Sequence, residues 1–92
     1  MALLDDGQVK DALAGVPGWS WRGDEIVKTF EFDDFVGSVG FVDAIVEPAE
    51  DMGHHPDLSI SWNKVEVSIS THSEGGLTAA DFELAAKIDQ LD

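Results

Sequence analysis

The stretch DLSISWNKVEVSIS, residues 57–70, decides the fold because apolar and polar residues alternate along it in two runs. The apolar positions are Leu58, Ile60 and Trp62 in the first run and Val65, Val67 and Ile69 in the second. A period of two predicts two strands, each with one buried and one solvated face. Asn63-Lys64 lies between the runs and is expected to form a two-residue hairpin loop.

Two further strands are expected upstream of the hairpin. Trp19-Ser20-Trp21 alternates briefly, and Gly23-Asp24 then provides a turn signal. Residues 25–32 follow as a second strand, in which Ile26 and Phe30 would point to the same face.

Three helices are expected, over residues 5–15, over residues 34–52 and from Thr78 onward. In the longest one, apolar residues recur at spacings of four, three, four and three, at Phe35, Val39, Val42, Val46 and Ala49. Pro48 conflicts with this helix, because proline removes a backbone donor and clashes with the preceding turn. Either a kink or an irregular last turn is therefore expected there.

The expected elements follow the order αββαββα, which defines an α+β fold. Hairpins on a sheet with one solvated face predict a four-stranded antiparallel sheet with the helices packed on the other face. Residues 1–92 fit one domain. A chain this short has a thin core, and self-association would help to stabilise it.

The charge balance is unusual, because 19 acidic residues face five basic ones for a formal net charge of −14. Nucleic acid and anionic membranes are poor partners for such a surface. The 12 aspartates against seven glutamates, with lysine scarce, favour a halophilic surface adapted to molar salt, which quenches self-repulsion. The alternative is an ordinary acidic protein or one with a basic partner.

The absence of some features limits the function further. Cysteine is absent, which excludes disulfides and thiolate zinc sites. The sequence has neither a basic and apolar leader nor an apolar run of roughly 20 residues, so a cytoplasmic protein without a membrane span is expected.

The three histidines, His54, His55 and His72, fall within nineteen residues. Opposed residues of a tight hairpin add to a constant, so a loop at Asn63-Lys64 would place position 55 opposite position 72. That register would gather the three imidazoles at one end of the sheet. Two alternatives stay open: separate surface or capping histidines, and a zinc site, for which no helical HExxH pair is present.

Four short motifs carry a resemblance to a known family. They are Ala49-Glu50-Asp51-Met52-Gly53-His54-His55-Pro56-Asp57, Trp62-Asn63-Lys64-Val65, Ser70-Thr71-His72, and Gly76-Leu77-Thr78 with Asp81. In sequence and separation they resemble the pterin-4a-carbinolamine dehydratase family, over almost the whole chain. The sequence departs from the family pattern at Asp51, where a lysine is frequent, and at Pro48.

The resemblance implies a set of site residues. The implied active-site imidazoles are His54, His55 and His72, and the implied substrate-binding residues are Glu50, Asp81 and Trp19. Each of the last three has a structural alternative. Asp81 has the spacing of a capping box with Thr78, Glu50 could be a solvated helix residue, and Trp19 could belong to the core.

The family's reaction removes water from a 4a-hydroxytetrahydropterin, the 4a-carbinolamine, and gives a quinonoid dihydropterin. An acid must protonate the departing oxygen and a base must take the N5 proton, and histidine titrates close to neutral pH. His72 and His55 are the expected proton-transfer residues, with His54 binding the substrate or sharing that work. No hydride moves, so neither a metal nor a nicotinamide cofactor is expected.

The resemblance also implies partners. It places the enzyme in tetrahydropterin recycling beside an aromatic amino-acid hydroxylase, as a homodimer or homotetramer. A second interpretation is a non-catalytic dimerisation or assembly module, because relatives act as partners of a homeodomain transcription factor and as assembly factors. The converging histidines favour the enzyme. A histidine metal-binding protein is the third interpretation.

Overall fold

The computed structural model describes residues 2–92 and confirms the expected α+β fold. The helices are α1 (Asp6–Leu13), α2 (Phe35–Met52) and α3 (Ala79–Asp89), with a short 3-10 turn, η1 (His72–Glu74). The strands are β1 (Ser20–Arg22), β2 (Glu25–Glu31), β3 (Asp57–Ser61) and β4 (Lys64–Ile69). They form one antiparallel sheet in the order β1-β2-β4-β3, so that β3 is an edge strand.

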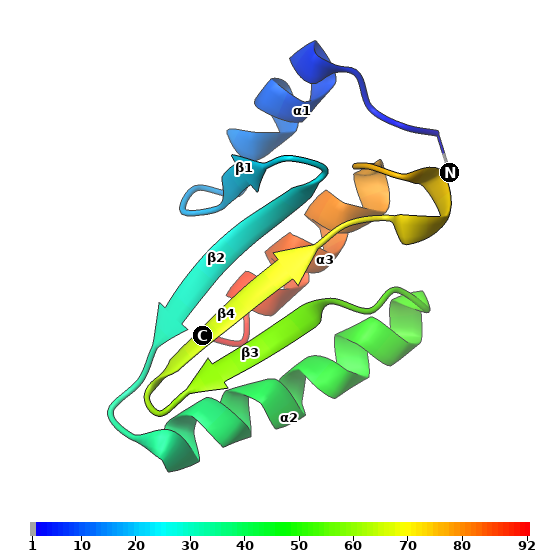
Figure 1. Ribbon diagram of the computed structural model, residues 1–92. Coiled ribbons are helices and arrows are strands. Elements are labelled where there is room, and N and C mark those ends of the chain that lie inside the picture. The colour runs from blue at the N-terminus through cyan, green and yellow to red at the C-terminus, as the bar shows by residue number, and fades with distance from the viewer. Residues whose placement is uncertain (1) are drawn as a thin grey trace.

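The core lies between one face of this sheet and the helices α2 and α3 (Figure 1). The central strands β2 and β4 contribute inward residues that are almost fully buried, namely Ile26, Phe30, Val65, Val67 and Ile69. The helices add Phe41, Ile45, Leu84 and Ile88. Burial of one such side chain contributes roughly 1.5–3 kcal/mol, so this layer stabilises most of the fold.

The β3–β4 hairpin is confirmed, but its predicted loop and register are wrong. Ser61 pairs with Lys64 and Ile60 with Val65, so the loop consists of Trp62 and Asn63 rather than Asn63 and Lys64. The pairing is displaced by two residues, an even number. Because side chains alternate with a period of two, the residues of the two strands keep their predicted alternation between the faces of the sheet. The predicted buried face of the first strand is wrong, however, because every residue of β3 is exposed and Trp62 lies in the loop.

Tertiary contacts hold this unexpected loop. Trp62 has a φ of +50°, in the left-handed region that hairpin loops normally fill with glycine or asparagine. The Trp62 carbonyl accepts a hydrogen bond from the hydroxyl of Ser38 at 2.7 Å. The Asn63 carbonyl accepts one from the backbone N–H of Phe32, also at 2.7 Å. These partners lie outside the hairpin and offset the local strain.

Helix α2 begins after its N-cap Asp34 and continues through Pro48 to Met52. Its predicted spacing marks a helix correctly, but of the five residues in that series only Ala49 is buried and Val42 partly buried. The buried residues are Ser38, Phe41, Ile45 and Ala49, whereas the exposed ones include Phe35, Val39 and Val46. Neither this helix nor any other in residues 2–92 is long and apolar enough to span a membrane.

Candidate active site

The three histidines lie at one end of the β3–β4 hairpin. Helix α2 ends at Gly53, whose φ of +60° requires the left-handed conformation that glycine adopts without strain. His54 and His55 follow, just before β3 begins at Asp57, and His72 opens η1 just after β4. The Nε2 of His72 lies 3.6 Å from the Oδ2 of Asp57. The segment that enters β3 and the segment that leaves β4 therefore both carry histidines, at the open end of the hairpin.

His54 is the most enclosed of the three. Its side chain is 15% exposed, and its Nε2 lies 2.6 Å from the Oδ1 of Asp81, a wholly buried residue in the first turn of α3. An ionised carboxylate only accepts hydrogen bonds, so the Nε2–H of His54 donates and its Nδ1 is left for another partner. Within residues 2–92 no lysine or arginine pairs with Asp81.

Asp81 also stabilises the start of α3. Its Oδ2 accepts hydrogen bonds from the backbone N–H of Thr78 at 2.8 Å and from the hydroxyl of Thr71 at 2.9 Å. Thr78 and Asp81 form a capping box. The capping interpretation of Asp81 is therefore correct, and it is compatible with a role at His54 because the two roles use different oxygens.

His55 pairs with Glu50 in the last turn of α2. The Nε2 of His55 and the Oε2 of Glu50 share a hydrogen bond, and both side chains are mostly exposed. Pro48 does not prevent this arrangement, although it lies only two residues before Glu50. Water screens an exposed ion pair strongly, so this contact adds little to stability.

His72 is held loosely, between Asp57 and Ser70. Its Nδ1 lies 3.5 Å from the Ser70 hydroxyl, and its side chain is 74% exposed. The sequence motif does not predict this role of Asp57, although the residue directly follows His-His-Pro at the start of β3. Each of the three imidazoles thus has a carboxylate of its own.

The structure does not group Trp19 with the histidines. Trp19 is buried, packs edge-on against Phe30 and donates its indole N–H to both carboxylate oxygens of Asp89 at 3.1 Å. Asp89 ends α3 and Asp81 lies in its first turn, which separates them by about 12 Å along the helix axis. Trp19 has a structural role in the core, and its contact with a substrate stays a prediction.

Two hollows adjoin two of the three imidazoles, and His72 lines neither of them. One has a volume of about 360 Å³, and its lining includes His54, Thr71, Ser73 and Glu83. The other, of about 170 Å³, is mostly apolar, with Val46 and Leu58 in its wall beside His55 and Glu50. His54 and His55 are consecutive residues that line different hollows, so the chain between α2 and β3 separates a hollow of mixed polarity from a mostly apolar one.

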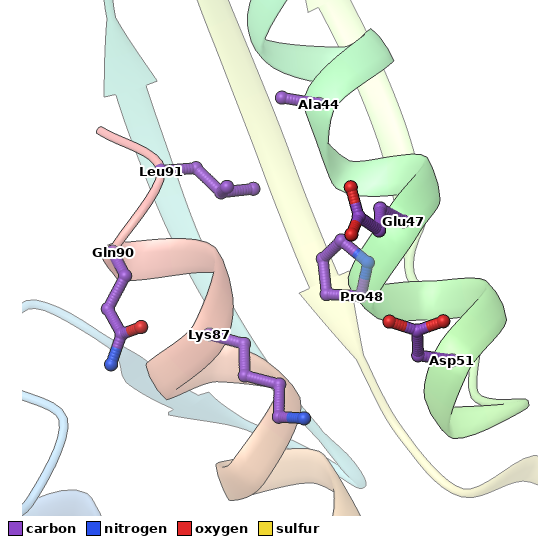
Figure 2. Close-up of a pocket in the computed structure, with 7 residues that line it drawn as sticks. All are labelled: Ala44, Glu47, Pro48, Asp51, Lys87, Gln90 and Leu91. Carbon is purple, nitrogen blue, oxygen red and sulfur yellow. The ribbon is translucent and has the colours of Figure 1, made fainter.

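Another hollow lies away from the histidines. It is a groove of about 440 Å³ between α2 and α3, where side chains from Lys87 and Leu91 reach toward Pro48 and Glu47 (Figure 2). No histidine lines it. Within residues 2–92 there is also no cluster of three or more His, Cys, Asp or Glu side chains able to hold a metal ion.

The fold and these residues define a small α+β protein whose candidate site consists of imidazole–carboxylate pairs, an arrangement suited to moving protons. The family model described as "Pterin 4 alpha carbinolamine dehydratase" matches residues 2–91. The chain belongs to this family, as its motifs predicted.

Individual relatives agree over nearly the full length. A protein of Thermosynechococcus vestitus named "Putative pterin-4-alpha-carbinolamine dehydratase" is 50% identical over 96% of this chain and 93% of its own. A protein of the same name from Sulfolobus acidocaldarius is 47% identical over 96% and 97%. A crystal structure titled as a transcriptional coactivator/pterin dehydratase from Brucella melitensis superposes with a TM-score of 0.93 at 32% identity, covering 98% of both chains.

A further solved structure shares the fold alone. It is titled as a pterin dehydratase-like protein that is a RuBisCO assembly factor in the alpha-carboxysome. It superposes with a TM-score of 0.64 at 23% identity, over 79% of this chain and 84% of its own.

Proposed function

We propose that this protein is a dehydratase that converts a 4a-hydroxytetrahydropterin to quinonoid dihydropterin and water, in tetrahydropterin recycling beside an aromatic amino-acid hydroxylase. The observation that carries the proposal is the enclosed His54–Asp81 pair beside a cavity, with His55 and His72 at the same end of the hairpin. Membership of the dehydratase family supports it.

The reaction needs two proton movements. The C4a–O bond breaks as the hydroxyl oxygen gains a proton and leaves as water, and N5 loses its proton as the N5–C4a double bond forms. Protons and electrons balance without an oxidant. His55 and His72 are exposed and exchange protons with water, so we assign them the acid and base roles. His54 presents its Nδ1 to the substrate.

The carboxylates favour the charge that develops on the pterin. The ring becomes more positive as the hydroxyl departs, and Asp81 and Glu50 stand directly behind two of the imidazoles. Their negative charge also keeps a protonated imidazole stable. We therefore propose that both act on the substrate through His54 and His55.

The test is a stopped-flow dehydration assay with synthetic carbinolamine, run at high salt. His72→Ala should fold normally, because the side chain is exposed, and should lose activity by roughly 100- to 10,000-fold. Thr29→Val, on the open face of β2, is the control and should match the wild type. Full activity in the single alanine variants of all three histidines would overturn the proposal.

We also propose self-association through an apolar surface of α2, β3 and their neighbours. Its exposed residues are Phe35, Val36, Val39, Val46, Leu58, Ile60 and Trp62. Together they expose an area on the order of the ~800 Å² per partner of a standard interface. None of them is charged, although the chain carries 19 acidic residues. Two copies of net charge −14 would meet with least repulsion at such a surface.

A homodimer or homotetramer is therefore expected at high salt, and light scattering coupled to size exclusion measures it. Val39→Lys places a charge in this surface without adding negative repulsion, and it should shift the protein toward monomer. Thr29→Lys adds the same charge on the open sheet face and should not. A wild-type protein that is monomeric at all concentrations would refute this proposal.

A further inference from the structure

Asp81 is a buried carboxylate whose hydrogen bonds are divided between its two oxygens. Oδ1 takes the Nε2–H of His54, and Oδ2 takes the hydroxyl of Thr71 and the backbone N–H of Thr78. The Asp81 side chain is wholly buried, so water does not replace a lost donor. The Thr71 hydroxyl thus supplies a substantial part of the solvation of this charge.

The hydroxyl protons around Asp81 have one consistent order. A carboxylate only accepts, so the Thr71 hydroxyl must donate to Asp81. The Thr71 and Thr78 hydroxyl oxygens lie 2.8 Å apart. Since the Thr71 proton is already used, the Thr78 hydroxyl donates to Thr71. Each hydroxyl proton is thus directed toward the carboxylate, and His54 is held with its proton on Nε2.

The backbone of Thr71 closes the turn that carries His72. Its carbonyl accepts hydrogen bonds from the N–H groups of Glu74 and Gly75, both at 3.0 Å, and its own N–H donates to the carbonyl of Gly76 at 2.9 Å. These bonds close the turn η1, which begins at His72. One residue is therefore bonded both to the partner of His54 and to the turn that carries His72.

We propose that Thr71 is a positioning residue: its hydroxyl, oriented by Thr78, fixes Asp81 as a pure acceptor and thereby sets the protonation of His54. Its effect on catalysis rests on the proposed dehydratase function, whereas its effect on His54 does not. Without the hydroxyl, Asp81 has one neutral donor fewer and attracts the imidazole proton more strongly. The charged form of His54 then persists to higher pH.

The experiment is an NMR titration of the full chain with ¹⁵N-labelled histidine, which has only three imidazoles to assign. In Thr71→Val, the titration midpoint of His54 should rise relative to the wild type, because Asp81 has lost one hydrogen-bond donor. Thr71→Ser retains the hydroxyl and should titrate like the wild type. The other charged group at this cavity, Glu83, is unchanged in all variants. Thr29→Val is the matched control.

Three results would overturn the proposal. They are an unchanged midpoint in Thr71→Val, an equal shift in Thr71→Ser, and a shift of His55 in place of His54. If Thr71→Val does not fold, Thr71→Ala removes the same hydroxyl with less bulk and carries the same expectation. In the dehydration assay kcat of Thr71→Val should fall about tenfold with KM within twofold. A shifted midpoint in a protein that dehydrates no carbinolamine would reject the dehydratase function and retain the role of Thr71.

Discussion

Raising potassium chloride from 0.1 to 1 M is expected to stabilise the folded chain strongly, because the Debye length falls from about 10 to 3 Å. The formal net charge is −14 and the radius of gyration is 12.8 Å. Spread over an equivalent sphere of about 17 Å radius, this charge repels itself in the folded state. The five basic side chains offset little of this repulsion, because 19 acidic side chains oppose them.

The size of the salt effect follows from Coulomb's law for a screened charged sphere in water. The self-repulsion of the folded chain falls by about 5 kcal/mol between the two salt concentrations. In the unfolded chain, whose radius of gyration is near 30 Å, the self-repulsion falls by only about 1–2 kcal/mol. The difference predicts about 3–4 kcal/mol of added stability, and a melting temperature higher by on the order of 15 °C.

Thermal unfolding followed by circular dichroism measures this effect. A variant in which the exposed Asp11, Asp24, Asp43 and Glu47 become amides loses four of its 19 negative charges and has a net charge of −10. Self-repulsion scales with the square of the charge, so its gain from salt should be about half that of the wild type. A melting temperature that does not respond to salt refutes the reasoning. An equal gain in both proteins refutes it too, since it would assign the effect to something other than screening.

Three substitutions test individual residues. Asp81→Asn leaves one acceptor oxygen and removes the charge-assisted bond to His54, so kcat for carbinolamine dehydration should fall at least about 100-fold; an unchanged kcat contradicts this. Trp19→Phe removes the bond to Asp89 and should cost about 1–2 kcal/mol in urea unfolding with KM unchanged; a raised KM at unchanged stability would place Trp19 in the substrate pocket. Pro48→Ala restores a helical donor and should raise urea stability by about 1–3 kcal/mol; lower stability would show that the proline ring contributes more through packing.

The order of the elements was predictable because local patterns and the tertiary structure agree over most of the chain. The hairpin register was not, because the decisive information lies outside the hairpin. Local rules place asparagine, not tryptophan, at a position of positive φ. Trp62 occupies that position because Ser38 binds its carbonyl. The histidines still lie at one end of the hairpin, since a shift of two residues leaves them next to the same strand ends.

The buried face of α2 could not be chosen from spacing alone. Apolar residues fill two adjacent stripes of this helix, and both satisfy a helical period. One stripe contains Phe41 and Ile45 and packs in the core, while the other contains Phe35 and Val39 and is exposed. An excess of apolar residues over what a monomer buries is itself a signal of a second partner.

The residues of the candidate site were easier to predict than their contacts. A motif identifies His54 and Asp81, but it contains no information about which atoms meet. The Asp81 side chain both caps the start of α3 and contacts His54. Burying a carboxylate is costly unless donors surround it, and the start of α3 already supplies the backbone N–H of Thr78. The helix start and Thr71 satisfy one oxygen, so the other is free to bind the imidazole. A chain of 92 residues can therefore hold a buried charge next to a histidine without a thick core, because the same carboxylate caps α3 and binds the imidazole.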